Sequence, residues 1–151
     1  MGKGSVMEIA PVTRSVVVDV PPEKAFDVFT LQIGSWWPTQ TYSIGDDKVT
    51  EVVFDAEGGR IYERWADGTT CDWAKILVLE APKRLVLAWS PTTEPSIPTE
   101  VEVRFTPVGT GTRVDLEHRG WERLAHGEKA RVGYDSGWPG VLALYQAAAN
   151  T

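Results

Sequence analysis

Hydrophobic and polar residues alternate along most of this chain, and short groups of turn-forming residues separate the alternating runs. The pattern is clearest at residues 112–118, where Val114, Leu116 and His118 share one face and charged residues occupy the other. Alternation with a period of two is typical of a β-strand with one buried and one solvent-facing side. The sequence therefore predicts strands at residues 13–20, 49–54, 60–65, 71–80, 84–90, 99–106 and 112–118.

A segment with helical character follows the first of these strands. Pro22 favours the first turn of a helix, and the spacing of apolar residues predicts a short helix at residues 22–29. A second short helix or turn is expected at residues 31–38, where Pro38 ends it. Residues 39–48 show no regular pattern and are expected to form a polar loop.

Near the C-terminus, apolar residues recur at intervals of three and four instead of two. Gly133 and Gly137 lie beside this stripe, and a glycine inside a helix costs roughly 0.5–1 kcal/mol relative to alanine. We expect a close approach to the sheet or to a ligand to offset that cost. The spacing predicts one long helix with a buried stripe of Tyr134, Trp138, Val141, Leu142 and Tyr145.

Pro139 lies within the stripe and lacks the backbone N–H that a helix interior needs. We expect it to kink the helix or to divide it after Trp138. The alternative is that the long helix begins only near Gly137 and that residues 122–136 form a separate turn.

The order of elements is a strand, two short helices, six strands and a long helix. Because no helix separates the six strands, the sheet is expected to be antiparallel and the fold class to be α+β. A seven-stranded sheet with a helix on one face must curve around that helix. We expect an aromatic-lined space between the sheet and the helix.

Composition is that of a single globular domain, with 151 residues and 42% hydrophobic content. The glycine-rich start is typical of a tag remnant, with Met7 as the natural first residue. We therefore expect residues 1–11 to be disordered or added for expression, and residues 12–149 to form the domain.

Charge and cysteine content exclude several classes of function. A net charge of −6 argues against binding to nucleic acid or to anionic membranes. The single cysteine, Cys71, fits a reducing compartment, and no apolar run is long enough to span a membrane, so we expect a cytoplasmic protein. His118 and His126 are the two histidines, and they form no metal-ligand motif with Cys71. We expect no metal and no cofactor.

Seven tryptophans stand out in a chain of this size. Such large rings can form a rigid core or the walls of a pocket, and apolar residues at core spacing are more often core. Both interpretations stay open for each of them. The candidate cavity residues are Trp36, Trp37, Tyr62, Trp65, Trp73, Ile76, Trp89, Val103, Leu116, His118, Tyr134, Trp138 and Leu142.

His118 is the polar residue of most interest, because it falls on the buried face of its strand. A lone histidine there is more often a hydrogen-bonded core residue. If it faces a cavity, it can orient a ligand or act as an acid or base near neutral pH. Its possible partners are Tyr62, Glu63, Tyr134 and Asp135.

The chain also resembles the family of activators of the heat-shock-protein-90 ATPase, within the START-like or SRPBCC superfamily that includes the birch pollen allergens. The resemblance extends from Val12 to about Ala148. It implies a helix-grip fold with a hydrophobic cavity, in a family whose members bind lipids, sterols and polyketides and include a few cyclases. The matching segments are residues 21–26 (PPEKAF), 33–38 (IGSWWP), 58–64 (GGRIYER), 80–89 (EAPKRLVLAW), 111–114 (GTRV), 118–121 (HRGW) and 137–138 (GW).

Three functions remain to be distinguished. The first is binding of an apolar or aromatic small molecule, such as a lipid, sterol or polyketide-like compound, between the sheet and the C-terminal helix. The second is a co-chaperone module that acts on a heat-shock-protein-90 homologue; for all three functions we expect a monomer or a homodimer. The third is a cyclase or hydrolase that uses His118.

Overall fold

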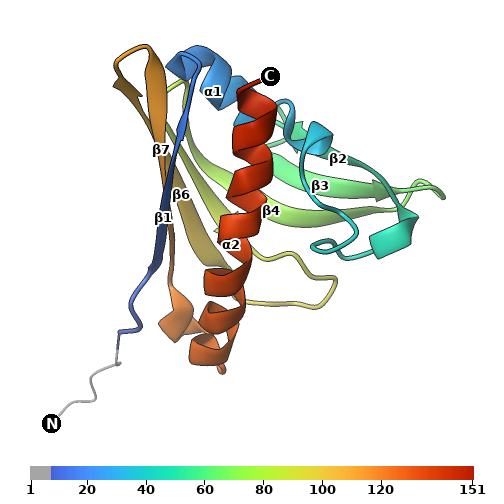
Figure 1. Ribbon diagram of the computed structural model, residues 1–151. Coiled ribbons are helices and arrows are strands. Elements are labelled where there is room, and N and C mark those ends of the chain that lie inside the picture. The colour runs from blue at the N-terminus through green and yellow to red at the C-terminus, as the bar shows by residue number, and fades with distance from the viewer. Residues whose placement is uncertain (1–7) are drawn as a thin grey trace, which may run out of the picture.

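The computed structural model describes residues 8–151, and in this part of the chain seven antiparallel strands form one sheet in the order β1-β7-β6-β5-β4-β3-β2. The strands are β1 (Val12–Val18), β2 (Val49–Asp55), β3 (Arg60–Trp65), β4 (Thr70–Glu80), β5 (Arg84–Trp89), β6 (Thr99–Val108) and β7 (Gly111–Arg119). The helices are α1 (Pro22–Phe29) and α2 (Gly127–Ala149), with 3-10 turns at Ile33–Ser35, Asp46–Lys48 and Trp121–Arg123. Figure 1 shows α2 lying along the sheet. The predicted fold class is confirmed.

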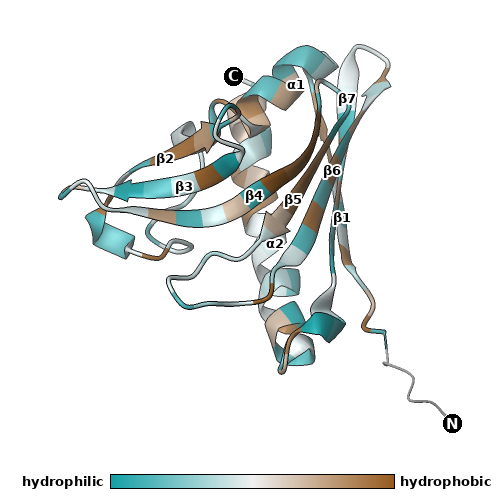
Figure 2. Ribbon diagram, turned by 180° about the vertical axis from the view of Figure 1, so that it is seen from behind, coloured by the Kyte–Doolittle hydropathy of each residue, from teal (hydrophilic) through white to brown (hydrophobic). Residues whose placement is uncertain are grey.

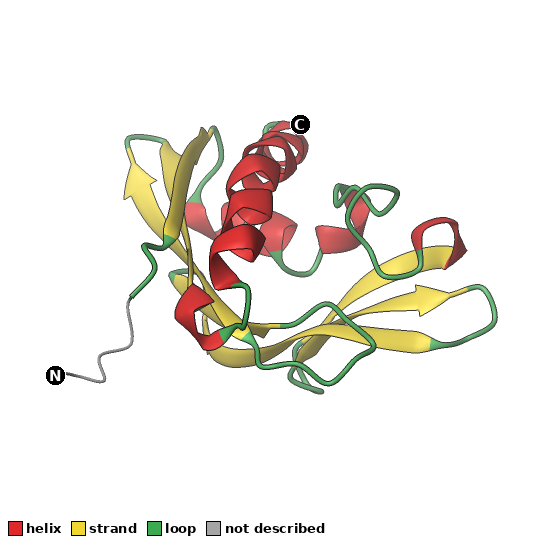
Figure 3. Ribbon diagram, turned by 90° about the horizontal axis from the view of Figure 1, so that it is seen from below, coloured by secondary structure: helices red, strands yellow, loops and turns green. Residues whose placement is uncertain are grey.

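The sheet curves around the helix. Figure 3 shows the helices on its concave side. The pairing register shifts once in each of three neighbouring strand pairs. The shift lies between Val49 and Glu51 in the pair β2–β3, between Ile61 and Tyr62 in β3–β4, and between Ile76 and Val78 in β4–β5. Irregular pairing of this kind bends a strand and increases its twist, so the shifts fit the curvature of the β2–β5 half.

The concave face carries the apolar positions that alternation predicts. Figure 2 shows hydrophobic and hydrophilic residues alternating along β6. Full burial of an aliphatic or aromatic side chain contributes about 1.5–3 kcal/mol, so this face and the α2 stripe supply most of the driving force for folding. The buried members are Leu85, Leu87, Trp89, Val101, Val103, Phe105, Val114, Leu116, Trp138, Val141, Leu142 and Tyr145.

One end of the concave face is filled by α1. The Phe26 and Phe105 rings lie 5.0 Å apart, and the Phe29 and Tyr145 rings lie 5.1 Å apart. The Tyr145 hydroxyl donates to the carbonyl oxygen of Ala25 at 2.8 Å. Aromatic contacts therefore close this end of the space between the sheet and α2.

The long helix is continuous, and the predictions that it is divided at Pro139 or begins near Gly137 are wrong. Pro139 cannot donate to the carbonyl oxygen of Asp135, one turn earlier. Arg14 on β1 donates to that oxygen instead, at 3.0 Å, and also pairs with the Asp135 carboxylate. The helix continues through Pro139, and the sheet supplies a donor for the carbonyl oxygen that the proline leaves free.

Residues 8–11 lie against this helix, and residues 1–7 of the expected disordered start lie outside the described residues. The Arg131 side chain donates to the carbonyl oxygens of Ala10 and Pro11. Ile9 packs against the core, and its backbone N–H donates to Glu122 at 3.3 Å.

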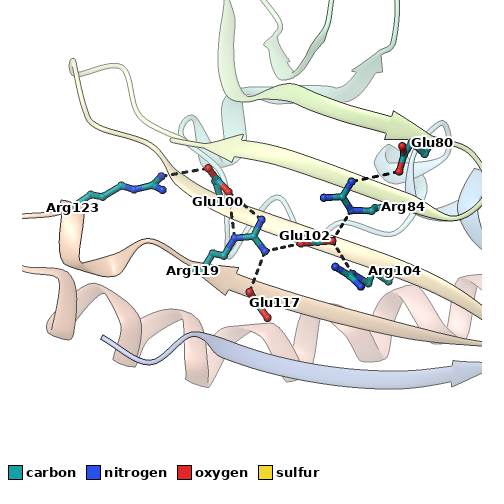
Figure 4. A network of polar contacts seen from close by, with 8 residues as sticks. All are labelled: Glu80, Arg84, Glu100, Glu102, Arg104, Glu117, Arg119 and Arg123. Atoms are coloured by element: carbon teal, nitrogen blue, oxygen red, sulfur yellow. Dashed lines mark hydrogen bonds and ion pairs between the residues drawn. The ribbon is translucent and has the colours of Figure 1, made fainter. Parts of the chain in front are cut away.

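The convex face of the sheet carries an ion-pair network across β5, β6 and β7 (Figure 4). At its centre is Glu102, which is only 5% exposed although alternation places it on the solvent side. It accepts from Arg84, Arg104 and Arg119, each at 2.7 Å. Burial alone would raise the pKa of Glu102, but the three guanidinium groups hold it at about 2. The network therefore gives the convex face of β5, β6 and β7 a charged surface.

Candidate ligand pocket

A pocket of about 630 Å³ opens on the concave side of the sheet, beside the N-terminal half of α2. Its other walls are the segment that follows Trp37 and the start of the loop after β5. Figure 1 shows both segments next to α2. This volume lies within the range of about 300–1,000 Å³ that is typical of small-molecule sites.

Four tryptophans form the inner wall of the pocket, with Trp37 at their centre. The Trp37 ring lies 5.0 Å from Trp73, 5.9 Å from Trp89 and 6.1 Å from Trp138, measured between ring centroids. Contacts in this range are favourable for aromatic pairs, by about 0.5–1.5 kcal/mol beyond their burial. The wall is therefore a set of rings that fix one another.

Every indole N–H of this wall is used inside the protein. Trp37 donates to the carbonyl oxygen of Tyr42 at 2.7 Å, and Trp73 donates to Glu63 at 2.7 Å. Trp89 donates to the Tyr134 hydroxyl and Trp138 donates to His118, both at 3.0 Å. The tryptophans therefore offer a ligand the faces and edges of their rings but no hydrogen-bond donor.

Glu63 organises one side of the pocket from behind the wall. This fully buried carboxylate accepts from the Trp73 and Trp65 indoles at 2.7 and 2.6 Å. It also accepts from the backbone N–H groups of Ile44 and Gly45 at 2.7 and 2.8 Å. Burial by itself would raise the pKa of Glu63, but these hydrogen bonds outweigh it and lower the pKa. Glu63 thus ties the loop that forms the pocket rim to the tryptophan wall.

His118 lies behind the wall and does not line the pocket. Because an indole nitrogen can only donate, Trp138 fixes His118 Nδ1 as the acceptor and places the ring proton on Nε2. Nε2 lies 2.7 Å from the Thr99 hydroxyl, which donates in turn to the carbonyl oxygen of Trp89 at 3.4 Å. Burial lowers the pKa of His118 to about 3. Both ring nitrogens are occupied and the ring is neutral, so a role as acid or base in the cavity is not supported.

None of the four possible partners named for His118, which are Tyr62, Glu63, Tyr134 and Asp135, forms a hydrogen bond with it. Glu63 bonds to the two indoles and the two backbone groups described above, and Asp135 pairs with Arg14. Tyr62 interacts with Arg60 and Arg64 through its ring and hydroxyl. Tyr134 contacts the histidine only through its ring, at 4.6 Å between centroids.

Polar side chains gather at the mouth of the pocket, which we define as Thr41, Ser43, His126 and Lys129. Ser43 is half-buried and the other three are exposed. Lys129 is the charged member, and its ammonium group carries a positive charge. An apolar interior with a polar, cationic mouth suits a ligand whose ring system enters first and whose polar or acidic end stays near solvent.

The two helix glycines have different surroundings. A Cβ atom at Gly137 would meet the Tyr42 hydroxyl at 3.0 Å, so Tyr42 closes over the helix at that point. A Cβ atom at Gly133 would have nothing within 4 Å. Gly133 lines the pocket and is exposed, so a side chain at this position would meet open space at the pocket wall.

Comparison with known proteins identifies the family. A family model described as Activator of Hsp90 ATPase homolog 1-like protein matches residues 19–148. The chain belongs to this family. No curated protein matches it.

Solved structures of similar proteins match nearly the whole chain. One is the self-sacrificing resistance protein CalC from Micromonospora echinospora, with 29% identity, coverage of 93% of this chain and 94% of that chain, and a TM-score of 0.69. Another is the anthrahydroquino-gamma-pyrone synthase Txn09, with 32% identity, coverage of 93% and 97%, and a TM-score of 0.61. The Aha1 dimer from Colwellia psychrerythraea has 18% identity, coverage of 94% and 97%, and a TM-score of 0.62, and its likeness shows the fold alone.

The predicted cavity residues fall into two groups, those that line the pocket and those that lie elsewhere. Those that line the pocket are Trp37, Trp73, Trp89, Tyr134 and Trp138. Contact of these residues with a ligand stays a prediction. Those that lie elsewhere are Trp36, Tyr62, Trp65, Ile76, Val103, Leu116, His118 and Leu142.

The residues of the second group have other roles. Trp36 donates to the carbonyl oxygen of Val28 at 2.7 Å within the core. Trp65 bonds to Glu63 and lies under the ammonium group of Lys48. Ile76 is half-buried and packs against the core. Full burial in the core accounts for Val103, Leu116 and Leu142.

Several lining residues were not predicted as cavity residues. Helical spacing could have found Ala130, which lies four residues before Tyr134 on the same face of α2. Loop residues carry no such periodic signal. The missed lining residues are Thr41, Tyr42, Ser43, Pro91, His126, Lys129, Ala130, Gly133, Gly137 and Val141.

Within residues 8–151, no group of three or more His, Cys, Asp or Glu side chains is placed to hold a metal ion. In the same range, no helix has the length and apolar character needed to cross a membrane.

Proposed function

We propose that this protein binds an apolar or aromatic small molecule in the pocket between the sheet and α2. The observation that carries the proposal is the tryptophan wall, in which four large rings border a cavity of about 630 Å³ instead of filling it. Trp37 is the half-buried ring of this wall, whereas Trp73, Trp89 and Trp138 are 1%, 5% and 3% exposed. A ligand that covers the apolar surface left open at the wall, above all at Trp37, would gain the free energy of its burial.

Among lipid, sterol and polyketide-like ligands, the wall favours flat aromatic compounds. Rings held by one another and by internal hydrogen bonds present fixed surfaces, which suit stacking and edge contacts with a rigid planar molecule better than contacts with a flexible chain. The similarity to Txn09 supports the same class, because that protein is named for a product built on an anthrahydroquinone.

The other functions receive less support. A cyclase or hydrolase based on His118 needs a histidine that reaches the substrate, and His118 is fully buried behind the wall. The co-chaperone function rests on the family's name. It predicts that a heat-shock-protein-90 homologue is retained by the immobilised protein, and this pull-down separates it from ligand binding.

Calorimetric titration with three compounds tests the proposal. We expect anthraquinone-2-carboxylate, a flat three-ring acid, to bind with one-to-one stoichiometry and more tightly than a fatty acid or a sterol sulfate. Binding should also protect the protein against thermal unfolding, since a ligand that binds only the folded state raises its stability. Absence of binding by all three compounds would contradict the proposal.

A further inference from the structure

The Tyr134 hydroxyl accepts a hydrogen bond within the protein but does not donate one. The phenol accepts from the Trp89 indole at 3.0 Å. A phenol can also donate its own proton, and no acceptor for that proton is found among residues 8–151. The oxygen therefore has a partner, whereas the proton has none within the described protein.

The position of the Tyr134 ring is fixed by its neighbours. Its centroid lies 4.6 Å from His118, 5.4 Å from Trp121 and 6.2 Å from Trp138. Both Tyr134 and its donor Trp89 line the pocket. The free proton therefore belongs to a group held in place at the pocket wall, so little ordering is needed when it donates to a ligand.

Two further features strengthen this donor. A hydroxyl that accepts a hydrogen bond becomes polarised and donates more strongly, and Trp89 supplies that bond. Burial raises the pKa of Tyr134 by more than the hydrogen bond from Trp89 lowers it, so the phenol keeps its proton at neutral pH. The surrounding indoles have no free donors, so the Tyr134 hydroxyl is the group beside them that can donate to a ligand.

We propose that Tyr134 is the ligand-orienting residue of the pocket and that it donates to a carbonyl or phenolic oxygen on the edge of a fused aromatic ring system. This inference rests on the proposed function, and it narrows the ligand from aromatic compounds in general to those with an oxygen acceptor on the ring edge, such as quinones and aryl ketones. The acidic end of such a ligand would lie toward Lys129 at the mouth.

A matched pair of ligands and a matched pair of variants test the role of Tyr134. Anthraquinone-2-carboxylate and anthracene-2-carboxylate share three rings and the acid, and they differ in the two carbonyl groups. Tyr134→Phe removes the hydroxyl and keeps the ring. Tyr62→Phe is the control, because it makes the same change at a tyrosine that does not line the pocket. Dissociation constants for both acids are measured by calorimetry with the wild type and with each variant.

The readout is the ratio of the two dissociation constants, in which any general loss of affinity cancels. We expect Tyr134→Phe to reduce the preference for the anthraquinone about three- to tenfold, as the loss of one hydrogen bond does. Tyr62→Phe should leave the ratio unchanged. An unchanged ratio in Tyr134→Phe would overturn this inference and leave the proposed function standing. Failure of both acids to bind the wild type would overturn both.

Discussion

Trp138 on α2 donates its indole N–H to Nδ1 of His118 on β7, at 3.0 Å. This single bond fixes the histidine tautomer and joins the pocket wall to the strand behind it. With Thr99 on the other nitrogen at 2.7 Å, the ring has no free position for a second proton unless a hydrogen bond breaks. The histidine is therefore part of the frame that holds the tryptophan wall.

This arrangement predicts how stability depends on pH. The pKa of His118 is about 3 in the folded protein and near the ordinary 6.5 in the unfolded chain. Between these values the unfolded state binds the extra proton, so stability falls as the pH falls. We expect the free energy of unfolding, measured by urea denaturation, to decrease by about 2 kcal/mol from pH 7.5 to pH 5.

Two variants attribute this slope to the buried ring. His118→Gln should flatten the pH dependence, whereas His126→Gln, at an exposed position, should keep it. The neighbours Thr99, Trp121, Tyr134 and Trp138 carry no charge in this range. Glu63 and Glu102 have lowered pKa values, and their contribution is lost only as the pH falls below their ordinary value of 4.5. A slope that persists in His118→Gln would contradict the assignment.

Glu63 is predicted to contribute to both stability and pocket order. Replacing it with Gln removes the charge and turns an amide group toward N–H donors that then have no acceptor. We expect a loss of about 2–3 kcal/mol in the free energy of unfolding. Hydrogen exchange at the Ile44 and Gly45 amides should become faster. Glu57→Gln, at an exposed turn position, serves as the control and should change stability by less than about 0.5 kcal/mol. Equal effects of the two substitutions would contradict this role.

The contact of Arg14 with the Asp135 carbonyl predicts a coupling with Pro139. Arg14→Met should cost about 1 kcal/mol in the wild type, because a carbonyl oxygen loses its donor. In a Pro139→Ala background, the new backbone N–H can bond to that carbonyl within the helix, so the same substitution should cost less. A double-mutant cycle by urea denaturation measures the coupling. An equal cost in both backgrounds would show that Arg14 does not compensate for the proline.

The fold was predictable because its signals are local. Val114, Leu116 and His118 alternate with charged residues. This pattern predicts a strand with one buried face, whichever strand it pairs with. The continuity of α2 was not predictable in this way. The donor that replaces the missing N–H of Pro139 comes from Arg14, which is 121 residues away from Asp135 in sequence.

The location of the pocket was only partly predictable, because residues on one face of the sheet meet different partners. Val103 and Trp89 both point inward. The end of the sheet near Val103 is filled by Phe26 and Phe29 from α1, whose rings lie 5.0 and 5.9 Å from Phe105. Trp89 lies where Gly133 leaves α2 without a side chain. Sequence spacing shows which residues point inward, and tertiary packing decides which of them border an empty volume.

Gly133 and Gly140 provide the most direct test of ligand binding in the pocket. Both lie inside α2, and a Cβ atom at either would have nothing within 4 Å, but only Gly133 lines the pocket. Replacing either glycine with Leu should raise helix stability by roughly 0.5–1 kcal/mol. Unfolding therefore cannot explain a loss of binding in these variants.

The decisive measurement is the affinity of anthraquinone-2-carboxylate for the Gly133→Leu and Gly140→Leu variants, determined by calorimetry beside the wild type. The leucine side chain introduced by Gly133→Leu would occupy the pocket, so we predict at least a roughly tenfold loss of affinity in this variant together with a raised melting temperature. Gly140→Leu should bind as the wild type does. Equal affinity in the two variants would contradict binding between the sheet and α2.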